Sequence, residues 1–325
     1  MNWKTKARIQ NGISRLPEGL SYAAYYAIQR RFGRLQEFEV FRKIRFAGEL
    51  RERLLANGGS FHGASFLEVG TGRVPMVPIA LWLLGAARVV TVDLNPYVVE
   101  RLTGEAIREL LSRPNRMRKL LGDGLREERV EQLRELVEGK DFSLSRLFEL
   151  AGIDYRAPGD ASKLELGDDS VDVHLSFLVF EHIPAPVLKA VLKEGKRLLS
   201  PSGLFLHRID YSDHFSHRDP SISVINFLQF SEEEWKRYAG NRYMFMNRLR
   251  HDDFLALFEG AGLEVIEQDP VVDERAAAQL ADGEIELDER FAGKTAEVLA
   301  IKNAWIVARG ADAPEEASLE EASPE

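Results

Sequence analysis

The sequence contains no cysteine among its 325 residues. Disulfide bonds, thiolate nucleophiles, and zinc or iron–sulfur sites with cysteine ligands are therefore excluded. An uncharged apolar run of about 18 residues is also missing, so no transmembrane helix is expected. The first 30 residues show no apolar stretch followed by a small-residue cleavage site, and we therefore expect a cytoplasmic protein.

Positive charge is scarce, because the formal net charge is −9. A broad nucleic-acid surface needs a dominant basic face, so nucleic acid is not expected as a partner. Basic residues gather in residues 1–60, which hold twelve Lys and Arg against five Asp and Glu. Aromatic and apolar residues recur there at helical spacing and predict a helical cap that closes a ligand cleft. The alternative is that residues 1–35 form a basic amphipathic surface in peripheral contact with a membrane.

Two short apolar segments that end in acidic residues and glycines organise the chain. Residues 66–72 have the sequence FLEVGTG, and residues 88–93 have the sequence RVVTVD, which ends in Asp93. Glycine lets backbone N–H groups approach a ligand closely, because it has no Cβ and tolerates φ > 0. A carboxylate at Asp93 stands where ribose hydroxyls lie in a doubly wound nucleotide fold. The pair predicts a site for an adenosine-bearing cofactor.

Helical and strand-like segments alternate from residue 65 to residue 211. The predicted strands are 65–69, 88–92, 153–156, 171–177 and 204–209, and two more, 263–267 and 300–308, close the chain. Alternation of this kind implies parallel strands with right-handed crossovers. We therefore expect an α/β fold with a doubly wound, mostly parallel, seven-stranded Rossmann-like sheet, an N-terminal helical cap and helical insertions.

The predicted domain organisation has three parts. Residues 1–60 form the cap and residues 61–310 the main domain, which contains a helical insertion at 97–150 and a polar, aromatic-rich substrate lid at 211–250. A helix inside the lid begins at Ser231, since Ser231 and Glu234 have the spacing of a capping box. Residues 311–325 carry six acidic side chains and no basic ones, which predicts a disordered acidic tail.

Five segments in this order resemble the class I S-adenosylmethionine-dependent methyltransferases, in their type 11-like form. FLEVGTG resembles the family's first motif, and Asp93 its ribose-binding acid. Asp160-Ala161 resembles the adenine-contacting pair, while 171–177 with FEHIP at 180–184 is similar to the fourth motif and the segment after it. LLSPSG at 198–203 resembles the turn before strand five. The resemblance covers roughly residues 60–310 and departs from the family pattern at Val74-Pro75, where a third glycine is common.

This resemblance implies S-adenosylmethionine as cofactor and a methyltransferase activity. It also implies a set of cofactor-binding residues: Glu68, Gly70, Thr71, Gly72, Asp93, Leu94, Asp160, Ala161 and Ser176. We expect a small-molecule or glycan acceptor, and because the predicted lid is polar and bears histidines, a hydroxyl group is the favoured methyl acceptor.

Catalytic candidates follow strands four and five, because ligands lie at the carboxyl ends of such strands. His182 is predicted as a base or substrate-orienting donor, with a structural helix-cap histidine as the alternative. His214 with Asp213 is the second candidate for the base, against an ordinary polar-loop pair. Tyr211, Arg248 and Arg250 are the predicted substrate residues; the arginines suit a carboxylate or phosphate, or equally pair with acidic side chains.

A metal site is a weaker possibility in the same region. His217, Asp219 and His251 could join His214 as ligands, since imidazole and carboxylate groups suit metal ions. The sequence fixes no geometry for them, so no metal is expected. His174 and His207 lie within predicted strands among apolar neighbours and are interpreted as core residues.

Two other functions fit part of the pattern. The two glycines with an acid about twenty residues later also match a nicotinamide dehydrogenase fingerprint. The third glycine is missing, however, and Pro75 offers no N–H to a pyrophosphate. A non-catalytic cofactor-binding scaffold is the other alternative. The acceptor and the oligomeric state are not disclosed by the sequence.

Overall fold

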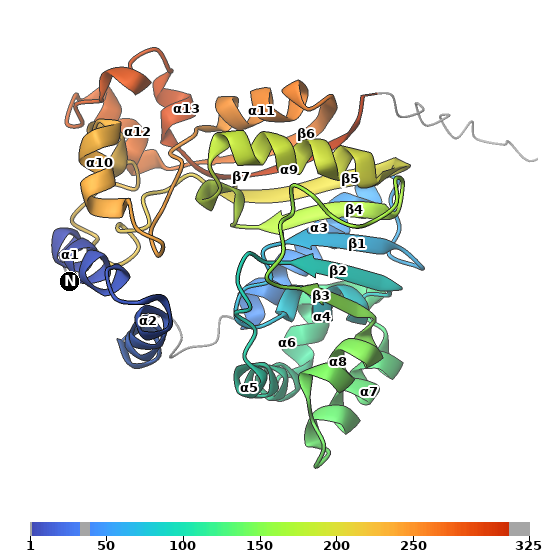
Figure 1. The fold of residues 1–325 in the computed structure, drawn as a ribbon. Coiled ribbons are helices and arrows are strands. Elements are labelled where there is room, and N and C mark those ends of the chain that lie inside the picture. Colours follow the sequence, from blue (N-terminus) through green and yellow to red (C-terminus); the bar gives the residue numbers. More distant parts are fainter. Residues whose placement is uncertain (1, 33–39, 312–325) are drawn as a thin grey trace, which may run out of the picture.

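In the computed structural model, residues 2–32 and 40–311 are described. Within them one sheet has the order β3-β2-β1-β4-β5-β7-β6 (Figure 1). Its strands are β1 (Ser65–Val69), β2 (Arg88–Val92), β3 (Ile153–Arg156), β4 (Val171–Phe177), β5 (Leu199–Asp210), β6 (Leu263–Val272) and β7 (Ile301–Gly310). The first five run parallel, and β7 is antiparallel to both of its neighbours. The predicted mostly parallel, Rossmann-like sheet is confirmed.

Helices connect the strands and cover both faces of the sheet. Before β1 lie α1 (Trp3–Ser14), α2 (Glu18–Phe32) and α3 (Val40–Ala56), and α4 (Met76–Leu83) joins β1 to β2. Four helices separate β2 from β3: α5 (Glu100–Leu111), α6 (Pro114–Leu121), α7 (Glu127–Glu138) and α8 (Leu144–Ala151). The later connections hold α9 (Ala185–Leu198), α10 (Glu232–Ala239), α11 (His251–Gly260), α12 (Glu274–Ala281) and α13 (Ala296–Ala300).

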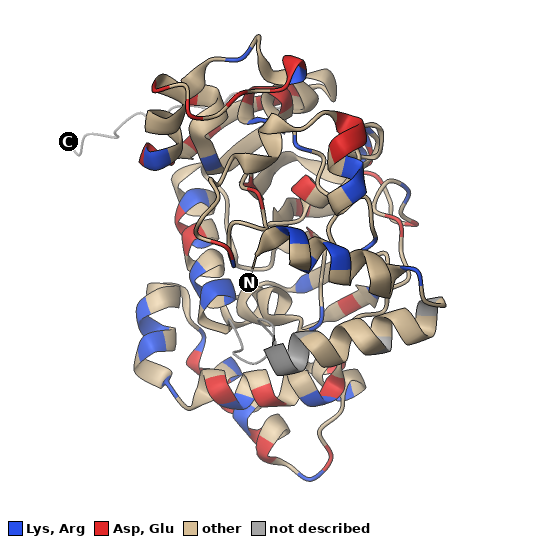
Figure 2. Cartoon of the chain, turned by 90° about the vertical axis from the view of Figure 1, so that its left-hand side faces the viewer, with Lys and Arg blue, Asp and Glu red and all other residues tan. Residues whose placement is uncertain are grey.

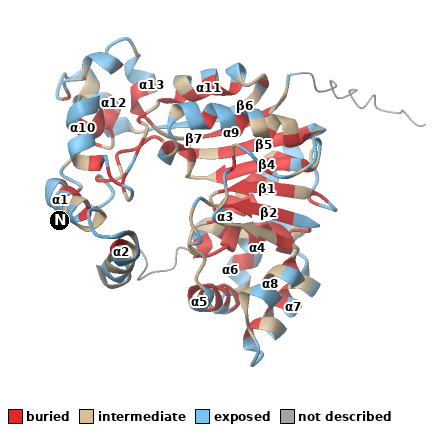
Figure 3. Cartoon of the chain, in the orientation of Figure 1, coloured by how far each residue is buried: buried red, intermediate tan, exposed pale blue. Residues whose placement is uncertain are grey.

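Two apolar cores lie against the sheet, one on each face. On one face the buried side chains of α3 to α8 pack against strand residues such as Phe66 and Val89. On the other, α9 and α11 pack against Leu67, Val90 and Phe205. The inner strands β1, β2, β4, β5 and β7 are buried along most of their length, whereas most residues of the edge strands β3 and β6 are not (Figure 3). Because α3 contributes Ile44 and seven other buried residues, it is a layer of the main domain, although the sequence interpretation assigned it to the cap.

A third core lies beyond the carboxyl ends of the parallel strands. It joins α1 to the segment after β5 and to α12 and α13, which the sequence interpretation did not identify. Trp3 is buried there against Phe215 and Tyr238, and its backbone N–H donates to Asp219 at 2.8 Å. The predicted capping box is confirmed, since Ser231 and Glu234 exchange both hydrogen bonds at the start of α10. Three distant parts of the chain thus build one core.

The face of α1 that carries Trp3 is covered by this third core, and its role as a cap that closes a ligand cleft stays a prediction. Peripheral membrane contact through residues 1–35 stays a prediction, and residues 33–35 of that range lie outside the described chain. So do residues 312–325 of the predicted acidic tail. No helix in the described parts of the chain has the length and apolar character to cross a membrane.

Candidate active site

The glycine turn after β1 is held in a conformation that excludes side chains. Gly70 and Gly72 have φ of +94° and +71°, the left-handed region that favours glycine. A Cβ on Gly70 would lie 2.4 Å from Cγ2 of Val179, which follows β4. A Cβ on Gly72 would meet nothing nearer than Nζ of Lys43, at 3.9 Å. The turn is therefore packed on the side of β4 and open at Gly72.

Asp93 ties this turn to the end of the neighbouring strand. One carboxylate oxygen accepts from the backbone N–H of Gly72 at 2.9 Å, and the other accepts from that of Asn95 at 3.1 Å. The next residue, Leu94, is 70% exposed although it is apolar. Lys43 of α3 donates to the carbonyl of Val74 at 2.9 Å and so stabilises the loop that departs from the family's glycine pattern.

Beneath the turn lies a buried chain of hydrogen bonds. The hydroxyl of Thr91 donates to the Glu68 carboxyl at 2.5 Å, so the Thr71 hydroxyl must donate to Thr91, 2.6 Å away. Burial raises the pKa of Glu68 to about 7, against the opposing effect of Lys43 and the bond from Thr91. Glu68 and Thr71 are 1% and 0% exposed. They support the turn from below, whereas the sequence interpretation assigned them to cofactor contact.

We expect Glu68 to make the protein less stable as the pH rises. Its folded pKa of about 7 exceeds the ordinary 4.5, so between these values the folded chain holds a proton that the unfolded chain has lost. The free energy of unfolding therefore falls across that interval, by roughly 3 kcal/mol at most, and levels off above it. Glu68→Gln should remove this contribution. Urea unfolding of both proteins at pH 5 and pH 7.5 measures it, and equal pH slopes would contradict the assignment.

The remaining predicted cofactor residues divide into two groups. Asp160 is exposed after β3, and one of its carboxylate oxygens accepts from the N–H and the hydroxyl of Ser162, which closes an Asx-turn. Ala161 is buried beside it. Ser176, in contrast, lies fully buried within β4 and bonds Nδ1 of His207 at 2.8 Å, so it faces the sheet interior. His174 and His207 are confirmed as buried core residues, and Nδ1 of His174 lies 3.1 Å from Nε2 of His207.

Polar residues from the ends of β4 and β5 meet in one place, here called the histidine–carboxylate cluster: Glu181, His182, Asp210, His214 and His217. Nε2 of His214 lies 3.3 Å from a carboxylate oxygen of Asp210, and Nε2 of His217 lies 3.8 Å from the same oxygen. The rings of His182 and His214 stack edge-on at 5.0 Å. Two of the three predicted catalytic residues, His182 and His214, are thus brought together.

The partner of His214 differs from the sequence prediction. Asp213 is fully buried and accepts from the Asn226 side chain at 2.9 Å and from the N–H of Phe215 at 2.8 Å. Burial raises its pKa to about 6. His214 pairs instead with Asp210, the last residue of β5, from which Nε2 of His214 is 3.3 Å away. Asp213 is a structural residue of the lid.

The pKa values of the two carboxyl groups of the cluster shift in opposite directions. Burial alone would raise the pKa of Asp210, but hydrogen bonds from His214 and Ser212 hold that pKa well below its usual range. The pKa of Glu181 lies well above its usual range, because burial and then the nearby Asp210 charge both disfavour its ionised form. The pKa of His182 is lowered, since surrounding protein atoms desolvate the ring and His214 lies beside it.

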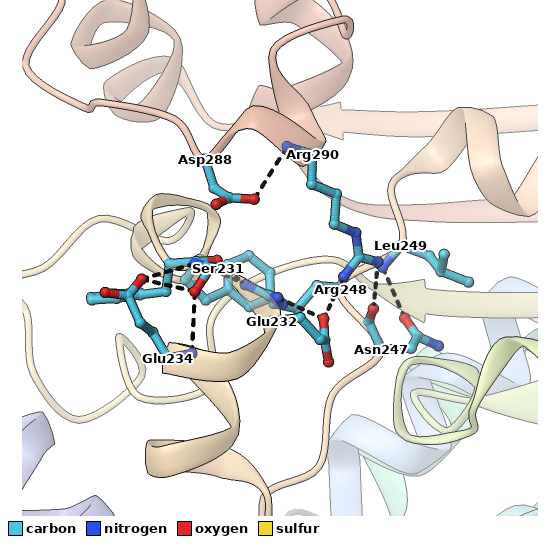
Figure 4. Close-up of polar contacts among 10 residues, drawn as sticks. Ser231, Glu232, Glu234, Asn247, Arg248, Leu249, Asp288 and Arg290 are labelled. Atoms are coloured by element: carbon cyan, nitrogen blue, oxygen red, sulfur yellow. Dashed lines mark hydrogen bonds and ion pairs between the residues drawn. The ribbon is translucent and has the colours of Figure 1, made fainter.

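The predicted substrate residues are engaged in structural contacts. Arg248 is buried, donates to the carbonyls of Phe227 and Phe230, and pairs with Glu232 at 2.7 Å (Figure 4). Tyr211 is 1% exposed, and its hydroxyl lies 3.1 Å from Nδ1 of His251. Arg248 and Tyr211 thus make structural contacts, and their part in substrate binding stays a prediction.

Arg250 is the most deeply held of these residues. Its guanidinium donates to the backbone carbonyls of Tyr211, Leu299 and Ile301 at 2.6, 2.8 and 2.5 Å. The residue is 0% exposed, and burial lowers its pKa to about 10. It therefore joins the end of β5, α13 and β7 rather than binding an anion.

An arginine-lined cavity of about 290 Å³ lies beside the cluster. Its walls come from α3, from the ends of β4 and β5, and from the start of β7, and are formed by Arg42, Arg45, Glu49, Phe177, Leu178, Arg208, Asp210, His217 and Asn303. Leu178 has a φ of +56°, which is uncommon for a bulky residue and is typical of functional sites. The cavity adjoins the glycine turn, because Leu178 precedes the Val179 that packs against Gly70.

The sequence interpretation missed the arginines of this cavity. Arg42, Arg45 and Glu49 are spaced by three and four residues, so they share one face of α3. Arg208 and Asp210 are two residues apart and share one side of β5. Arg208 pairs with Glu49 and so closes part of that wall. The helical spacing of Arg42, Arg45 and Glu49 could have predicted their common face, but only the position of α3 against the sheet shows that this face lines a cavity.

A family model described as a methyltransferase domain matches residues 38–268, most of the chain. The protein therefore belongs to the methyltransferase domain family. It is an enzyme of methyl transfer whose cofactor is S-adenosylmethionine, and this decides against the dehydrogenase and scaffold alternatives. No curated protein sequence matches the chain.

Several solved structures are similar to this chain at low identity. An S-adenosylmethionine-dependent methyltransferase from Methanosarcina mazei has 14% identity and a TM-score of 0.44, over 79% of this chain and 96% of its own. A chain from the Haloferax volcanii complex of the Trm112 methyltransferase activator with a putative methyltransferase has 18% identity and a TM-score of 0.41, over 83% of this chain and 90% of its own. A putative sarcosine dimethylglycine methyltransferase from Galdieria sulphuraria has 14% identity and a TM-score of 0.44, over 82% of this chain and 86% of its own. Scores this low carry no argument about the acceptor.

The geometry at β1 and β2 fits S-adenosylmethionine. The backbone at Gly72 faces open space, because Gly72 has no side chain and only Nζ of Lys43 lies within 4 Å of the position of a Cβ. The Asp93 carboxylate stands at the same edge of the sheet, since β1 and β2 are parallel neighbours whose last residues, Val69 and Val92, are paired. The exposed Leu94 adds an uncovered apolar surface beside it. An approachable backbone, a carboxylate and an uncovered apolar side chain thus lie at one end of the sheet.

Proposed function

We propose that the protein transfers the methyl group of S-adenosylmethionine to a hydroxyl group of a small-molecule or glycan acceptor. The observation that carries this proposal is the arginine-lined cavity, whose wall includes Asp210 and His217 and which adjoins the glycine turn. Its volume of about 290 Å³ suits a small molecule or a single sugar unit rather than a large polymer segment. The lid face does not form one basic surface, since Lys and Arg are interspersed with Asp and Glu (Figure 2).

Cofactor and acceptor would occupy neighbouring strand ends. Gly70, Gly72, Asp93 and Leu94 would hold the cofactor, with Asp160 and Ala161 at its adenine end. The cofactor supplies, when bound, a methyl group on a sulfonium sulfur that is open to displacement. The task of the protein is to align the acceptor with that group and to exclude water. Because the strand order is β2-β1-β4-β5, an acceptor in the cavity would lie beside a cofactor held in this way.

The histidine–carboxylate cluster offers the acid–base chemistry that a hydroxyl acceptor needs. As the acceptor oxygen forms its bond to the methyl carbon, the hydroxyl proton must leave, and an imidazole can take it. His214 is our candidate, because Asp210 lies 3.3 Å from its Nε2 and favours the protonated ring that would result. His182 lies against His214 and would orient the acceptor.

The charge of the cavity wall indicates which chemical class of acceptor the cavity favours. Arg42 and Arg45 line it from α3, beside the paired Arg208. Guanidinium groups bind carboxylates and phosphates in a planar, two-pronged geometry. We therefore favour an acceptor that carries an anionic group as well as a hydroxyl, such as a uronic acid or a sugar phosphate.

A methyl-transfer screen with labelled cofactor tests this proposal. Neutral sugars, uronic acids, sugar phosphates, nucleotide sugars and phenols are offered together with amine analogues of the same size. We expect transfer to oxygen, and His214→Gln should lower kcat about 100-fold or more while S-adenosylhomocysteine still binds. His62→Ala serves as control, because His62 is exposed and precedes β1, so it lies at the amino-terminal end of that strand and away from the cluster. Transfer to nitrogen alone, or full turnover in His214→Gln, would overturn the hydroxyl mechanism.

A further inference from the structure

The histidine–carboxylate cluster contains two sets of potential metal ligands that share His214. Ligand atoms of Glu181, His182 and His214 lie within 4.8 Å of one another, and so do those of Asp210, His214 and His217. Donors about 2.1 Å from a common ion stand roughly 3 to 4 Å apart. The distances from Asp210 to His214 and to His217, 3.3 and 3.8 Å, fall in that range.

Glu181 supplies an independent sign of a missing ligand. It lies in the single 3-10 turn Phe180–His182, is 2% exposed, and neither of its carboxylate oxygens has a hydrogen bond with acceptable geometry among the described residues. An ionised carboxylate that is buried without a partner costs several kcal/mol, so a buried acid is normally hydrogen-bonded, protonated or bound to a metal ion. Asp213, the other fully buried acid of this region, shows the usual arrangement with its two donors.

The donors are also oriented as metal ligands are. Nδ1 of His182 lies 2.8 Å from the backbone carbonyl of Phe245. A carbonyl can only accept, so Nδ1 carries the proton and the lone pair is on Nε2. An imidazole that is fixed in this way through its second nitrogen is typical of metal sites. Asp210 is fixed likewise, because Ser212 donates to one of its oxygens through both the backbone N–H and the hydroxyl.

We propose that the histidine–carboxylate cluster binds one divalent first-row transition-metal ion, such as Zn²⁺, Fe²⁺ or Mn²⁺. Each ligand set offers two imidazoles and one carboxylate to the ion, and such a set favours these metals over Mg²⁺ and Ca²⁺, which prefer oxygen ligands throughout. The ligand set differs from the one considered from the sequence. Asp219 accepts from the backbone N–H of Trp3, and His251 bonds Tyr211 and Gln268, so neither belongs to the cluster.

The position of the cluster gives the ion a role. Asp210 and His217 also line the arginine-lined cavity, so an ion at this place could polarise an acceptor oxygen that enters from there. With the ion bound, His214 would be a ligand and not the base; the ion would lower the pKa of the acceptor hydroxyl, whose proton would then leave to water. This role rests on the proposed function, whereas the binding of the ion does not.

Cobalt titration of the full-length, tag-free protein tests the site directly. After chelator treatment we expect Co²⁺ to bind with one equivalent and to give visible d–d absorption, which one equivalent of Zn²⁺ removes. His214→Ala should weaken binding at least 100-fold, because both ligand sets lose a member, and Glu181→Gln about tenfold or more. His62→Ala should bind as the unaltered protein does. Bound Zn²⁺ should raise Tm in the unaltered protein and not in His214→Ala.

The outcomes separate the proposals. Binding that is equally strong in His214→Ala, or no stoichiometric binding in the unaltered protein, would overturn the metal site. Circular dichroism checks that each variant is folded, and Asp210→Asn, which keeps the side-chain volume, provides a second weakened variant should His214→Ala not fold. No acceptor or methyl donor is used, so the result is independent of whether the acceptor is a hydroxyl.

Discussion

Asp93→Ala is expected to weaken S-adenosylhomocysteine binding by about ten- to a hundredfold. The carboxylate holds the backbone N–H of Gly72 at 2.9 Å and that of Asn95 at 3.1 Å, and so fixes the glycine turn against the end of β2. It would also accept from the ribose hydroxyls, and a charge-assisted hydrogen bond contributes about 1.5 to 3 kcal/mol. Isothermal titration calorimetry measures the change.

Asp93→Asn separates the two contributions of this side chain. The amide keeps the size and one acceptor for Gly72, so the turn should persist while the ribose loses a charged acceptor. We expect an affinity between those of the unaltered protein and Asp93→Ala, with similar Tm. Unchanged affinity in both variants would show that the carboxylate serves the turn alone and that the ribose lies elsewhere.

Gly48→Ala is expected to destabilise the protein by about 2 to 4 kcal/mol, although alanine favours helices. A Cβ on Gly48 would lie 2.0 Å from the backbone carbonyl oxygen of Leu120, so α3 and α6 touch at their backbones. The obstacle is backbone within a helix and cannot rotate away, and overpacking of this kind outweighs the gain in helix propensity of about 1 kcal/mol. Urea unfolding measures the loss.

Gly12→Ala is the matched control, because Gly12 also lies within a helix, α1, and a Cβ there meets nothing within 4 Å. It should leave stability unchanged or raise it by up to about 1 kcal/mol. If Gly48→Ala proved as stable as Gly12→Ala, the close approach of α3 to α6 would be wrong, and with it the position of Arg42 and Arg45 at the cavity.

The sheet could be predicted from the sequence because its signals are local. The strands at 65–69, 88–92, 153–156 and 171–177 coincide with β1 to β4, since each is a short apolar or alternating run bounded by polar or glycine residues. β5 begins earlier than predicted, at Leu199, because Leu199 pairs with Val171 of β4, and β6 runs further than predicted, to Val272, because its pairing with β7 continues. Neighbouring strands, rather than local propensity, set those ends.

The site could be predicted only where one strand end or one turn defines it. Gly70, Gly72 and Asp93 follow their strands directly and lie together as expected. The partner of His214 could not be found in this way, because Asp213 is adjacent in sequence whereas Asp210 is adjacent in space. Buried arginines are equally hidden: a basic residue beside acidic neighbours suggests surface, and only the fold shows that carbonyls from three segments surround Arg250.

The position of Arg250 has a consequence for how the lid can open. A guanidinium removed from three carbonyls without reaching water would leave a buried charge unsatisfied, at a cost of several kcal/mol. Any movement that admits cofactor and acceptor therefore keeps this group in place. Arg250 thereby holds the two ends of the segment from Tyr211 to Arg250 together, while the middle of that segment packs against α1 in the third core.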